Sequence, residues 1–278
     1  MDSHPFLETL KKRGIIQGLD RMYNALSEIN NPQMSQKGAL IGGTNGKGST
    51  SFILYNLLYS HGFRTALYTS PHIREINDRY LSDGKVISDE KLVYYIENLG
   101  FLAEKYRLTL FEFETLIAFR YFSDINTDFS VYEVGMGGRL DATNCFDPKI
   151  KIITSVSKDH TEYLGNTEES ILYEKAGIIK KNNIVITGID NPRLLTILRG
   201  YCHKRNATLL ESDKDFYAEN VREDEGFEIF DYYYKDLCLK NLKLSLFGRY
   251  QVTNCALSLT AFAEIMNIYG HKIFTDKI

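Results

Sequence analysis

The stretch GGTNGKGST, residues 42–50, decides the fold of this chain. It follows a short apolar run at 39–41 and leads into a helical pattern over 49–61, which Gly62 closes. A second short apolar run follows at 65–68. Strand, glycine-rich turn, helix and strand in this order predict a βαβ unit, and therefore a parallel sheet.

The chemistry of this stretch favours binding of an anion. Consecutive glycines let backbone N–H groups turn inward, and the following helix presents its free N-terminal donors to the same point. Lys47 adds a full positive charge for β- and γ-phosphates, and the hydroxyls of Ser49 and Thr50 can face Mg²⁺. The stretch departs from the usual G-x-x-x-x-G-K-[ST] pattern, because Ile41 and Gly48 replace its first glycine and its hydroxyl residue. The alternative is a glycine-rich turn that only joins strand to helix.

Apolar patterns divide the rest of the chain into alternating helices and strands. Helices are predicted over 5–30, 89–106, 112–123, 167–176, 191–206 and 249–268, strands over 129–134, 151–156 and 184–187, and a polar loop over 70–88. The predicted fold class is α/β, with a doubly wound, mostly parallel sheet. From about 208 to 246 the pattern alternates with period two, which predicts an appended antiparallel β-meander.

The composition is that of a globular protein and excludes several classes. Hydrophobic residues make up 44% and charged residues 25%, with a net charge of −3, so neither disorder nor binding to nucleic acid or membrane is expected. No apolar run approaches the roughly 18 residues of a spanning helix, and the first 14 residues lack a signal-peptide core. The four cysteines form no C-x-x-C pair, so we expect reduced thiols in a cytoplasmic protein.

Several motifs, taken in order, are similar to those of one enzyme family. GTNGKGS at 43–49, with a glycine after the lysine, resembles the ATP loop of the folylpolyglutamate synthase/dihydrofolate synthase branch of the Mur ligase superfamily. EVGMGGRLDATN at 133–144 is the most specific match, because it nearly repeats the family's EVGLGGRLDATN. Further similar segments are YTSPHI at 68–73, DHTEYLG at 159–165, EKAGI at 174–178 and FGRYQVTN at 247–254. The resemblance runs from about Ile15 to the last residue.

The resemblance implies an ATP-dependent amide ligase that phosphorylates a carboxylate, after which the amine of L-glutamate attacks the acyl phosphate. Residues 1–278 would form a Mur ligase-like ATP-binding domain. Lys47, His160 and Lys175 would be catalytic. The implied ATP contacts are Thr44, Asn45, Gly46, Lys47, Gly48, Ser49, Thr50 and Asn254.

The resemblance also implies two magnesium sites. Ser70 and Glu133 would bind one ion and His160 the other, while Lys175 would be carbamylated, which turns a cation into an oxygen ligand. The residues alone leave other interpretations open: Glu133 as an acidic strand end facing water, Ser70 as a turn residue, His160 as a core or capping histidine, Lys175 as a solvated charge, and Asn254 as a helix cap.

The substrate that the resemblance implies is dihydropteroate, a folate, or both. Phe111 offers a stacking surface for a flat ring. The G-x-G at 135–137 is similar to a dinucleotide motif, but Leu140 stands where a small residue should be, so NAD is rejected. The residues implied for the substrate are Ile15, Ile16, Gln17, Gly18, Thr109, Leu110, Phe111, Glu112, Leu140, Asp141 and Ala142.

Members of this family continue past the point where this sequence stops. We therefore expect the domain that supplies much of the glutamate site to be absent, and the chain to bind nucleotide weakly and turn over poorly. We also expect a monomer. Two other functions stay open, a cell-wall Mur ligase and a non-catalytic nucleotide-binding module, although Gly48 and the RLDATN block at 139–144 oppose the first.

Overall fold

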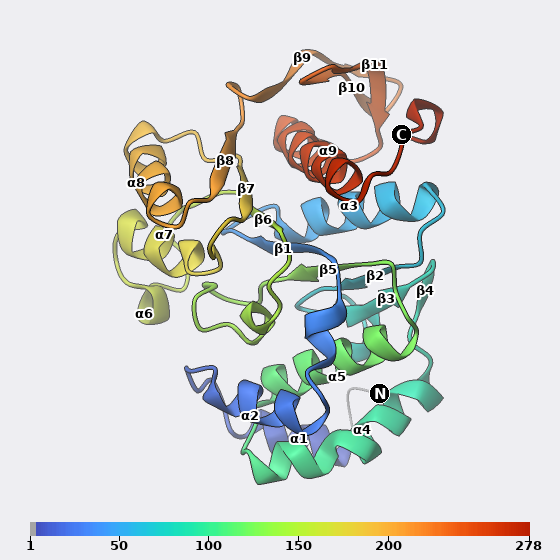
Figure 1. Cartoon of the computed structure of the whole chain (residues 1–278), viewed down its shortest axis with the longest axis vertical. Coiled ribbons are helices and arrows are strands. Elements are labelled where there is room, and N and C mark those ends of the chain that lie inside the picture. The colour runs from blue at the N-terminus through green and yellow to red at the C-terminus, as the bar shows by residue number, and fades with distance from the viewer. Residues whose placement is uncertain (1–3) are drawn as a thin grey trace.

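A large mixed sheet forms the centre of the computed structural model, which describes residues 4–278 (Figure 1). Its strands lie in the order β4-β3-β2-β5-β1-β6-β7-β8. Neighbouring strands from β2 to β8 pair in parallel, whereas β3 pairs antiparallel with both β2 and β4. The parallel strands are β1 (Gly38–Gly42), β2 (Thr65–Tyr68), β5 (Phe129–Glu133), β6 (Ile150–Ile153), β7 (Ile184–Thr187) and β8 (Thr208–Glu211). The predicted α/β class with a mostly parallel sheet is confirmed.

The carboxyl end of β1 lies where the winding of the sheet changes direction. After β1 the chain passes through α3 (Lys47–Ser60) to β2 on one side, whereas after β5 it continues to β6 on the other side of β1. Open α/β sheets leave a crevice for ligands at such a switch point. The loops after β1, β5 and β6 therefore meet at the natural place for a site.

Alternate residues of β1 enter two different hydrophobic cores. Ala39 and Ile41 pack with α3 and α9 (Arg249–Tyr269), whereas Leu40 packs with the helices on the opposite face. A strand buried on both faces explains why the apolar run at 39–41 is continuous. The helices that contribute to the second core are α1 (Pro5–Lys11), α2 (Asp20–Glu28), α4 (Asp89–Lys105), α5 (Leu110–Asp124), α7 (Glu168–Ala176) and α8 (Pro192–Lys204).

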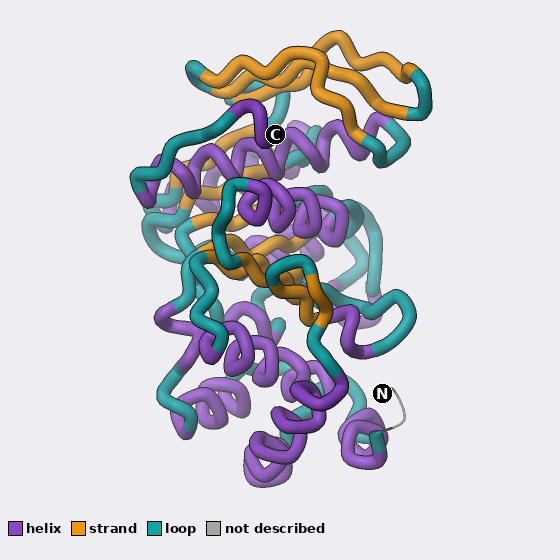
Figure 2. The backbone as a smooth tube through the Cα atoms, turned by 90° about the vertical axis from the view of Figure 1, so that its right-hand side faces the viewer, coloured by secondary structure: helices purple, strands orange, loops and turns teal. Residues whose placement is uncertain are grey.

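A smaller antiparallel sheet covers the outer side of α9 (Figure 2). Its strands are β9 (Phe216–Asp224), β10 (Phe227–Tyr234) and β11 (Leu237–Leu244). The hydroxyl of Tyr232 lies 2.7 Å from that of Thr260 on α9, and the hydroxyl of Tyr234 donates to Glu264 at 2.7 Å. These bonds satisfy the polar ends of buried tyrosines and so fix the small sheet on the helix.

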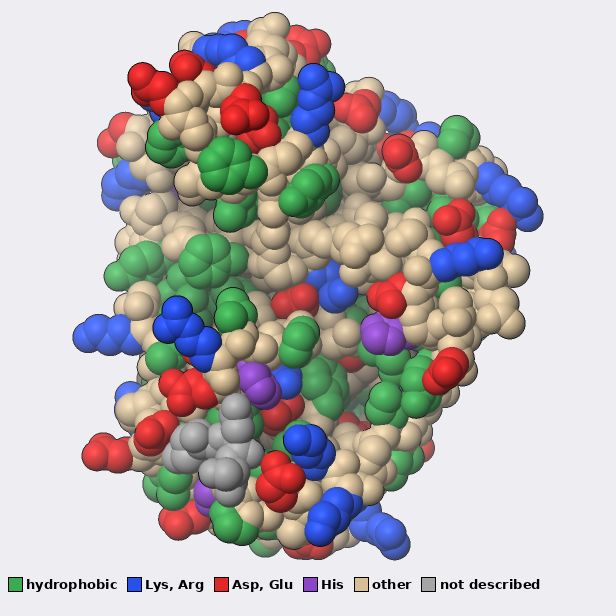
Figure 3. Space-filling model, turned by 180° about the vertical axis from the view of Figure 1, so that it is seen from behind, with side chains coloured by type: hydrophobic (Ala, Val, Ile, Leu, Met, Phe, Trp, Pro, Cys, Tyr) green, Lys and Arg blue, Asp and Glu red, His purple; other side chains and the backbone are tan. Residues whose placement is uncertain are grey.

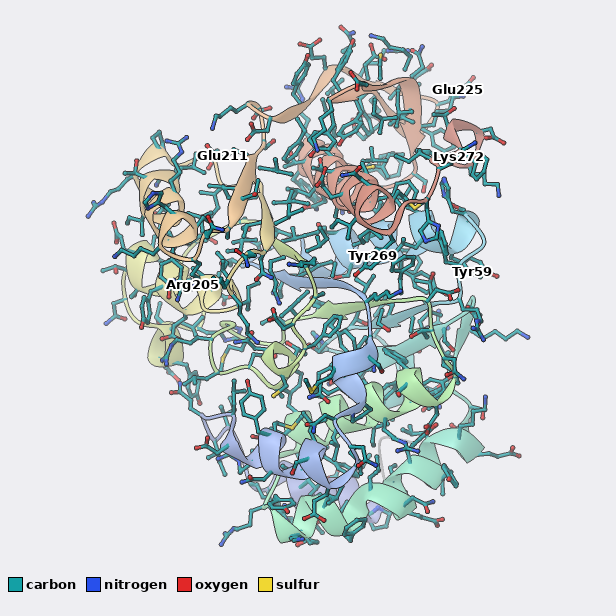
Figure 4. All side chains as sticks on the ribbon, in the orientation of Figure 1. Tyr59, Arg205, Glu211, Glu225, Tyr269 and Lys272 are labelled. Atoms are coloured by element: carbon teal, nitrogen blue, oxygen red, sulfur yellow. The ribbon has the colours of Figure 1, made fainter. Side chains whose placement is uncertain are left out.

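Two predictions about the strands are corrected. The segment 70–88, predicted as a loop, contains the 3₁₀ turn Ile76–Arg79 and the strands β3 (Tyr80–Ser82) and β4 (Lys85–Val86). Asp83 and Gly84 join these strands with φ angles of 46° and 78°, as a tight two-residue hairpin requires. Strand β8, counted with the meander, pairs in parallel with β7, so the antiparallel sheet begins at Phe216. Figure 4 shows Glu211 of β8 and Glu225 of the β9–β10 turn on either side of α9.

Strand β6 ends at Ile153 rather than at 156, because the residues that follow turn toward the loop after β1. Short helical turns lie in several connections, Pro32–Ser35, Ala142–Cys145 and α6 (Thr161–Leu164), and a further turn, Thr275–Lys277, follows α9. Across residues 4–278, none of the helices combines the length and the apolar character needed to cross a membrane.

Candidate active site

The loop at 42–50, which we call the phosphate loop, is held in shape by the residues after β6. The N–H of Thr44 donates to the carbonyl of Ser155 at 2.8 Å, and the hydroxyl of Thr154 donates to the carbonyl of Asn45 at 2.7 Å. Gly43 has a φ of 146°, and a Cβ there would overlap the Thr154 hydroxyl. The loop is therefore shaped in advance by side chains that the sequence motif does not include.

The phosphate loop leaves the N-terminus of α3 open for an anion. Gly46 occupies the N-cap with a φ of 84°, and no side chain of residues 4–278 caps the helix. The Nζ of Lys47 donates to the carbonyl of Thr44 at 3.1 Å, which keeps the ammonium at the loop. Free N–H donors, the positive end of the helix dipole and this ammonium suit a phosphate. Thr50 is fully buried and its hydroxyl has no hydrogen-bond partner among the described residues, whereas Ser49 keeps partial exposure, so both hydroxyls stay candidates for a bound ion.

Asn254 packs directly on the phosphate loop. Its side-chain oxygen occupies the space that a Cβ on Gly46 would need, and its amide donates to Gln251 at 2.9 Å. Helix α9 begins at Arg249 with Gly248 as its N-cap, so the capping interpretation of Asn254 is wrong. Contact with this loop supports the nucleotide role that the sequence predicts for Asn254.

Ser70 and Glu133 come together at the ends of neighbouring strands. The N–H of Ser70 donates to Oε2 of Glu133 at 3.3 Å, while the buried Ser70 hydroxyl has no hydrogen-bond partner among the described residues. Glu133 is 5% exposed, so it is not an acidic residue facing water. Burial raises the pKa of Glu133 to about 7, against the opposing effect of Lys47.

These two residues fit a magnesium ion. The unpartnered Ser70 hydroxyl and the buried Glu133 carboxylate are adjacent hard oxygen donors of the kind that Mg²⁺ prefers. A divalent cation would also offset the cost of burying the charged carboxylate. Loop oxygens and phosphates would have to complete the shell, because residues 4–278 hold no cluster of three His, Cys, Asp or Glu side chains suited to a metal.

Lys175 reaches the phosphate loop from the other side. Its Nζ donates to the carbonyl of Gly43 at 2.8 Å, and the residue is only 2% exposed, so the interpretation as a solvated charge is wrong. Burial, reinforced by the positive charge of Lys47, lowers the pKa of Lys175 to about 8. A buried lysine with a lowered pKa has an accessible neutral amine, which carbamylation by CO₂ requires.

His160 lies at the rim of the site and not in the core. It precedes α6 with a φ of 45°, makes no side-chain cap, and places Nε2 3.6 Å from Oδ2 of Asp159. The side chain is 52% exposed, so both the core and the capping interpretations are wrong. An exposed imidazole beside an aspartate remains available to a ligand.

A cavity of about 390 Å³ adjoins these residues. Ser70 and His160 line it, as do nine of the eleven residues predicted for the substrate, while Gly18 and Leu110 do not. The ring of Phe111 packs on Gly135, where a Cβ would overlap it. In the view from behind, Figure 3 shows histidine, acidic and basic side chains across the middle of the molecule with hydrophobic side chains between them. The predicted residues that line the cavity are Ile15, Ile16, Gln17, Thr109, Phe111, Glu112, Leu140, Asp141 and Ala142.

Comparison with known protein families matches residues 41–262 to the Mur ligase middle domain. This chain belongs to the Mur ligase family. The match runs from the last residues of β1 to within α9, so it includes the phosphate loop, Glu133, Lys175 and Asn254.

Curated relatives of this Mur ligase chain carry folate-related names. It is 32% identical over 273 residues to the dihydrofolate synthase/folylpolyglutamate synthase of Bacillus subtilis, covering 96% of this chain and 63% of the relative. It is 32% identical over 246 residues to the folylpolyglutamate synthase of Lacticaseibacillus casei, covering 86% and 58%. The chain therefore spans about three fifths of the length of these relatives.

Solved structures agree with the fold. The apo form of L. casei folylpolyglutamate synthase superposes with a TM-score of 0.94 at 28% identity, covering 100% of this chain and 70% of that one. A folylpolyglutamate synthase in complex with AMPPCP and folate gives a TM-score of 0.93 at 28% identity and the same coverage.

Asp141 organises the glycine-rich turn of this Mur ligase site. Its carboxylate accepts hydrogen bonds from the N–H of Met136 at 2.9 Å and from the N–H of Thr143 at 3.0 Å. Burial raises the pKa of Asp141, against the lowering effect of these bonds. A residue predicted to contact substrate therefore also shapes the wall of the cavity.

Arg21 is a site residue that sequence reasoning missed. Its guanidinium forms a partly buried ion pair with Glu112 at 2.8 Å and donates to the carbonyl of Ile16. Glu112 is itself fixed, because it accepts from the N–H of Thr109 at 2.8 Å in a capping box. Arg21 thus ties the segment 15–18 to the start of α5 across the cavity.

Proposed function

We propose that this chain provides the nucleotide and pteroate sites of an ATP-dependent carboxylate–amine ligase, which joins L-glutamate to dihydropteroate or to a folate. The proposal rests on one observation: Ser70 belongs both to the cavity and to the pair with Glu133 beside the phosphate loop. The same residue lines the cavity of about 390 Å³ and donates its N–H to Glu133, next to the phosphate loop. A carboxylate at this end of the cavity would lie beside the γ-phosphate of ATP.

The reaction needs a carboxylate oxygen to bond to the γ-phosphorus of ATP while the bond to the β–γ bridging oxygen breaks. The products are ADP and an acyl phosphate. The amine of glutamate then bonds to the acyl carbon and loses a proton, and inorganic phosphate leaves. Positioning of two polyanions supplies most of the catalysis in such transfers.

The residues of this chain have distinct roles in the proposal. Lys47 and the N–H groups at the start of α3 hold the β- and γ-phosphates, and Asn254 contacts the nucleotide base. Ser70 and Glu133 hold one magnesium ion, and His160 together with carbamylated Lys175 holds a second. Bound Mg²⁺ would offset the repulsion between phosphate and carboxylate. The N–H that a carbamate retains can still donate to Gly43.

We also propose that the protein acts as a cytoplasmic monomer on small molecules, with neither nucleic acid nor membrane as partner. Its four cysteines are free thiols, and three of them are buried, as suits a reducing compartment.

The test is ADP release by the chain with three candidate acids, dihydropteroate, tetrahydrofolate and UDP-muramoyl peptides, each with and without L-glutamate. We expect ADP release that only the pteroate or folate acids stimulate. Stimulation by the muramoyl acids alone would favour a cell-wall ligase. Nucleotide binding without stimulation by any acid would favour a non-catalytic module.

A further inference from the structure

Arg79 lies in the wall of the cavity, although neither the motifs nor the predicted site residues include it. Among the described residues that line the cavity, Arg79 is the only lysine or arginine. It is 9% exposed, so its charge is largely withdrawn from water. A buried guanidinium in a ligand cavity calls for a functional explanation.

The sheet places Arg79 beside Ser70. Strand β2 pairs antiparallel with β3 so that Tyr68 faces Tyr80, and the N–H of Thr69 donates to the carbonyl of Arg79 at 3.1 Å. Residues 69 and 79 are therefore direct neighbours, and both Ser70 and Arg79 line the cavity. The positive charge of Arg79 also opposes the rise in the pKa of Glu133, as expected for a cation near that carboxylate.

Two side chains hold the guanidinium in place. Its Nε donates to Nδ1 of His72 at 3.1 Å, and its Nη1 lies 3.4 Å from Oε2 of Glu114. Nη1 has no acceptor in hydrogen-bond geometry among the described residues. The planar fork of arginine matches a carboxylate in geometry, and here one of its buried donors is left unsatisfied.

The charges of the other lining residues make a cation necessary for an acidic ligand. Glu112, Asp141 and Glu174 line the same cavity. Glu112 is paired with Arg21 and Glu174 with Arg139, whereas among the described residues Asp141 accepts hydrogen bonds only from neutral groups of its own turn. A carboxylate that enters this cavity is therefore stabilised most by the positive charge of Arg79.

We propose that Arg79 binds the carboxylate of the pteroate or folate substrate and orients it beside the phosphate loop. This inference rests on the proposed function. The flat ring lies at the apolar part of the cavity near Phe111 and Leu140, and the acid lies at the Ser70 end. Glu114 acts through Arg79 as a positioning residue, because its carboxylate fixes the guanidinium.

The experiment compares pteroic acid with its carboxamide, a neutral ligand of nearly the same shape. Binding is followed by pterin fluorescence without nucleotide or magnesium, so that no metal contributes to the preference. The proteins are the wild-type chain, R79Q/E114Q, E114Q, and the control R120Q, which removes an arginine from an exposed ion pair with Asp124. The double variant removes both members of the buried pair and so leaves no uncompensated charge.

The wild-type chain and R120Q should bind the acid about 10- to 100-fold more tightly than the carboxamide. The affinities of R79Q/E114Q for the two ligands should lie within about threefold of each other, while E114Q should still bind the acid more tightly than the carboxamide. If Arg79 had only a structural role, R79Q/E114Q would bind both ligands more weakly by the same factor. The ratio of the two affinities would then stay unchanged, which would overturn the proposal.

The ratio of the wild-type affinities for acid and carboxamide can overturn the proposal even if the double variant does not fold. Equal binding of acid and carboxamide by the wild-type chain would overturn the role of Arg79 and leave the proposed function standing. Binding of neither ligand by the wild-type chain, with AMPPCP still bound, would contradict the proposed substrate itself. R79K keeps the charge but loses the fork, so its ratio should fall between those of the wild-type chain and R79Q/E114Q.

Discussion

The Nζ of Lys175 donates a hydrogen bond of 2.8 Å to the carbonyl oxygen of Gly43, so a buried lysine of α7 is attached to the backbone of the phosphate loop. Lys47 approaches the same loop from α3. Burial disfavours the charged form of Lys175, and the positive charge of Lys47 adds to this effect, so the pKa of Lys175 is lowered. Both its contact and its lowered pKa suit the proposed carbamylation of Lys175.

Carbamylation of Lys175 is expected in bicarbonate. Only the neutral amine reacts with CO₂, so the modified fraction should rise as the pH increases through about 8, the pKa of Lys175. The measurement is ¹³C NMR of the chain in labelled bicarbonate at pH 7 and pH 9. The carbamate signal should disappear in Lys175→Met and persist in the control Lys181→Met, whose lysine is exposed. A signal that survives in Lys175→Met would place the modification elsewhere.

Replacement of Glu133 by glutamine should stabilise the metal-free chain at alkaline pH. Burial raises the pKa of Glu133 from 4.5 to about 7, so the folded chain binds more protons than the unfolded chain between these values. The free energy of unfolding should therefore fall as the pH rises through this window, and Glu133→Gln should recover about 2–3 kcal/mol at pH 8 but nothing near pH 4.

Urea unfolding at the two pH values measures this difference. Mg²⁺ should stabilise the wild-type chain at pH 8 and leave Glu133→Gln unchanged, because the ion needs the carboxylate. Equal stability of the two proteins at pH 8 would show that the carboxyl is not buried as described.

Replacement of Gly46 by alanine should weaken nucleotide binding. A Cβ at Gly46 would overlap the side chain of Asn254, and the φ of 84° is unfavourable for alanine. Gly62 is a matched control, since its φ is 89° and, its chain neighbours apart, no atom of the described residues lies within 4 Å of an added Cβ. Both variants should lose about 1 kcal/mol of stability from backbone strain. Only Gly46→Ala should also bind AMPPCP more weakly, by more than tenfold, as measured by calorimetry. An equal loss of AMPPCP affinity in both variants would contradict the role of the contact between Gly46 and Asn254.

Replacement of Arg21 should weaken the binding of the acid substrate and leave the binding of nucleotide unchanged. Arg21→Gln releases the segment that holds Ile16 and leaves Glu112 without its ion-pair partner. We expect about tenfold weaker binding of pteroic acid, with AMPPCP binding unchanged. Fluorescence titration and calorimetry measure the two ligands separately. A parallel loss of both affinities would mean that the substitution disturbs the whole sheet.

The local sequence pattern identified the elements that form from neighbouring residues. The apolar run at 39–41, the glycines of 42–50 and the helix that ends before Gly62 are all local, and the structure contains each of them. Thr167, a residue type that favours the N-cap, and the acidic residues that follow it likewise marked the start of α7 correctly. The position of the phosphate loop between strand and helix could therefore be predicted from the sequence.

Features that depend on distant residues were missed. Strands β3 and β4 lie in a polar segment whose Asn77, Arg79 and Ser82 are buried only by the tertiary fold. The Asp83-Gly84 pair was the one local signal for that hairpin. Strand β8 looks like part of the meander, because alternation along a strand does not reveal its partner. The pair of Arg21 and Glu112 joins residues 91 positions apart, which periodicity cannot show.

The most direct test of the account is a calorimetric titration of the chain with Mg²⁺ and AMPPCP, followed by pteroic acid. We predict that nucleotide binds to the wild-type chain and that Lys47→Ala removes this binding. Pteroic acid should then bind to the nucleotide-loaded wild-type chain. Absence of any nucleotide binding by the wild-type chain would contradict the claim that the phosphate loop holds ATP beside the substrate cavity.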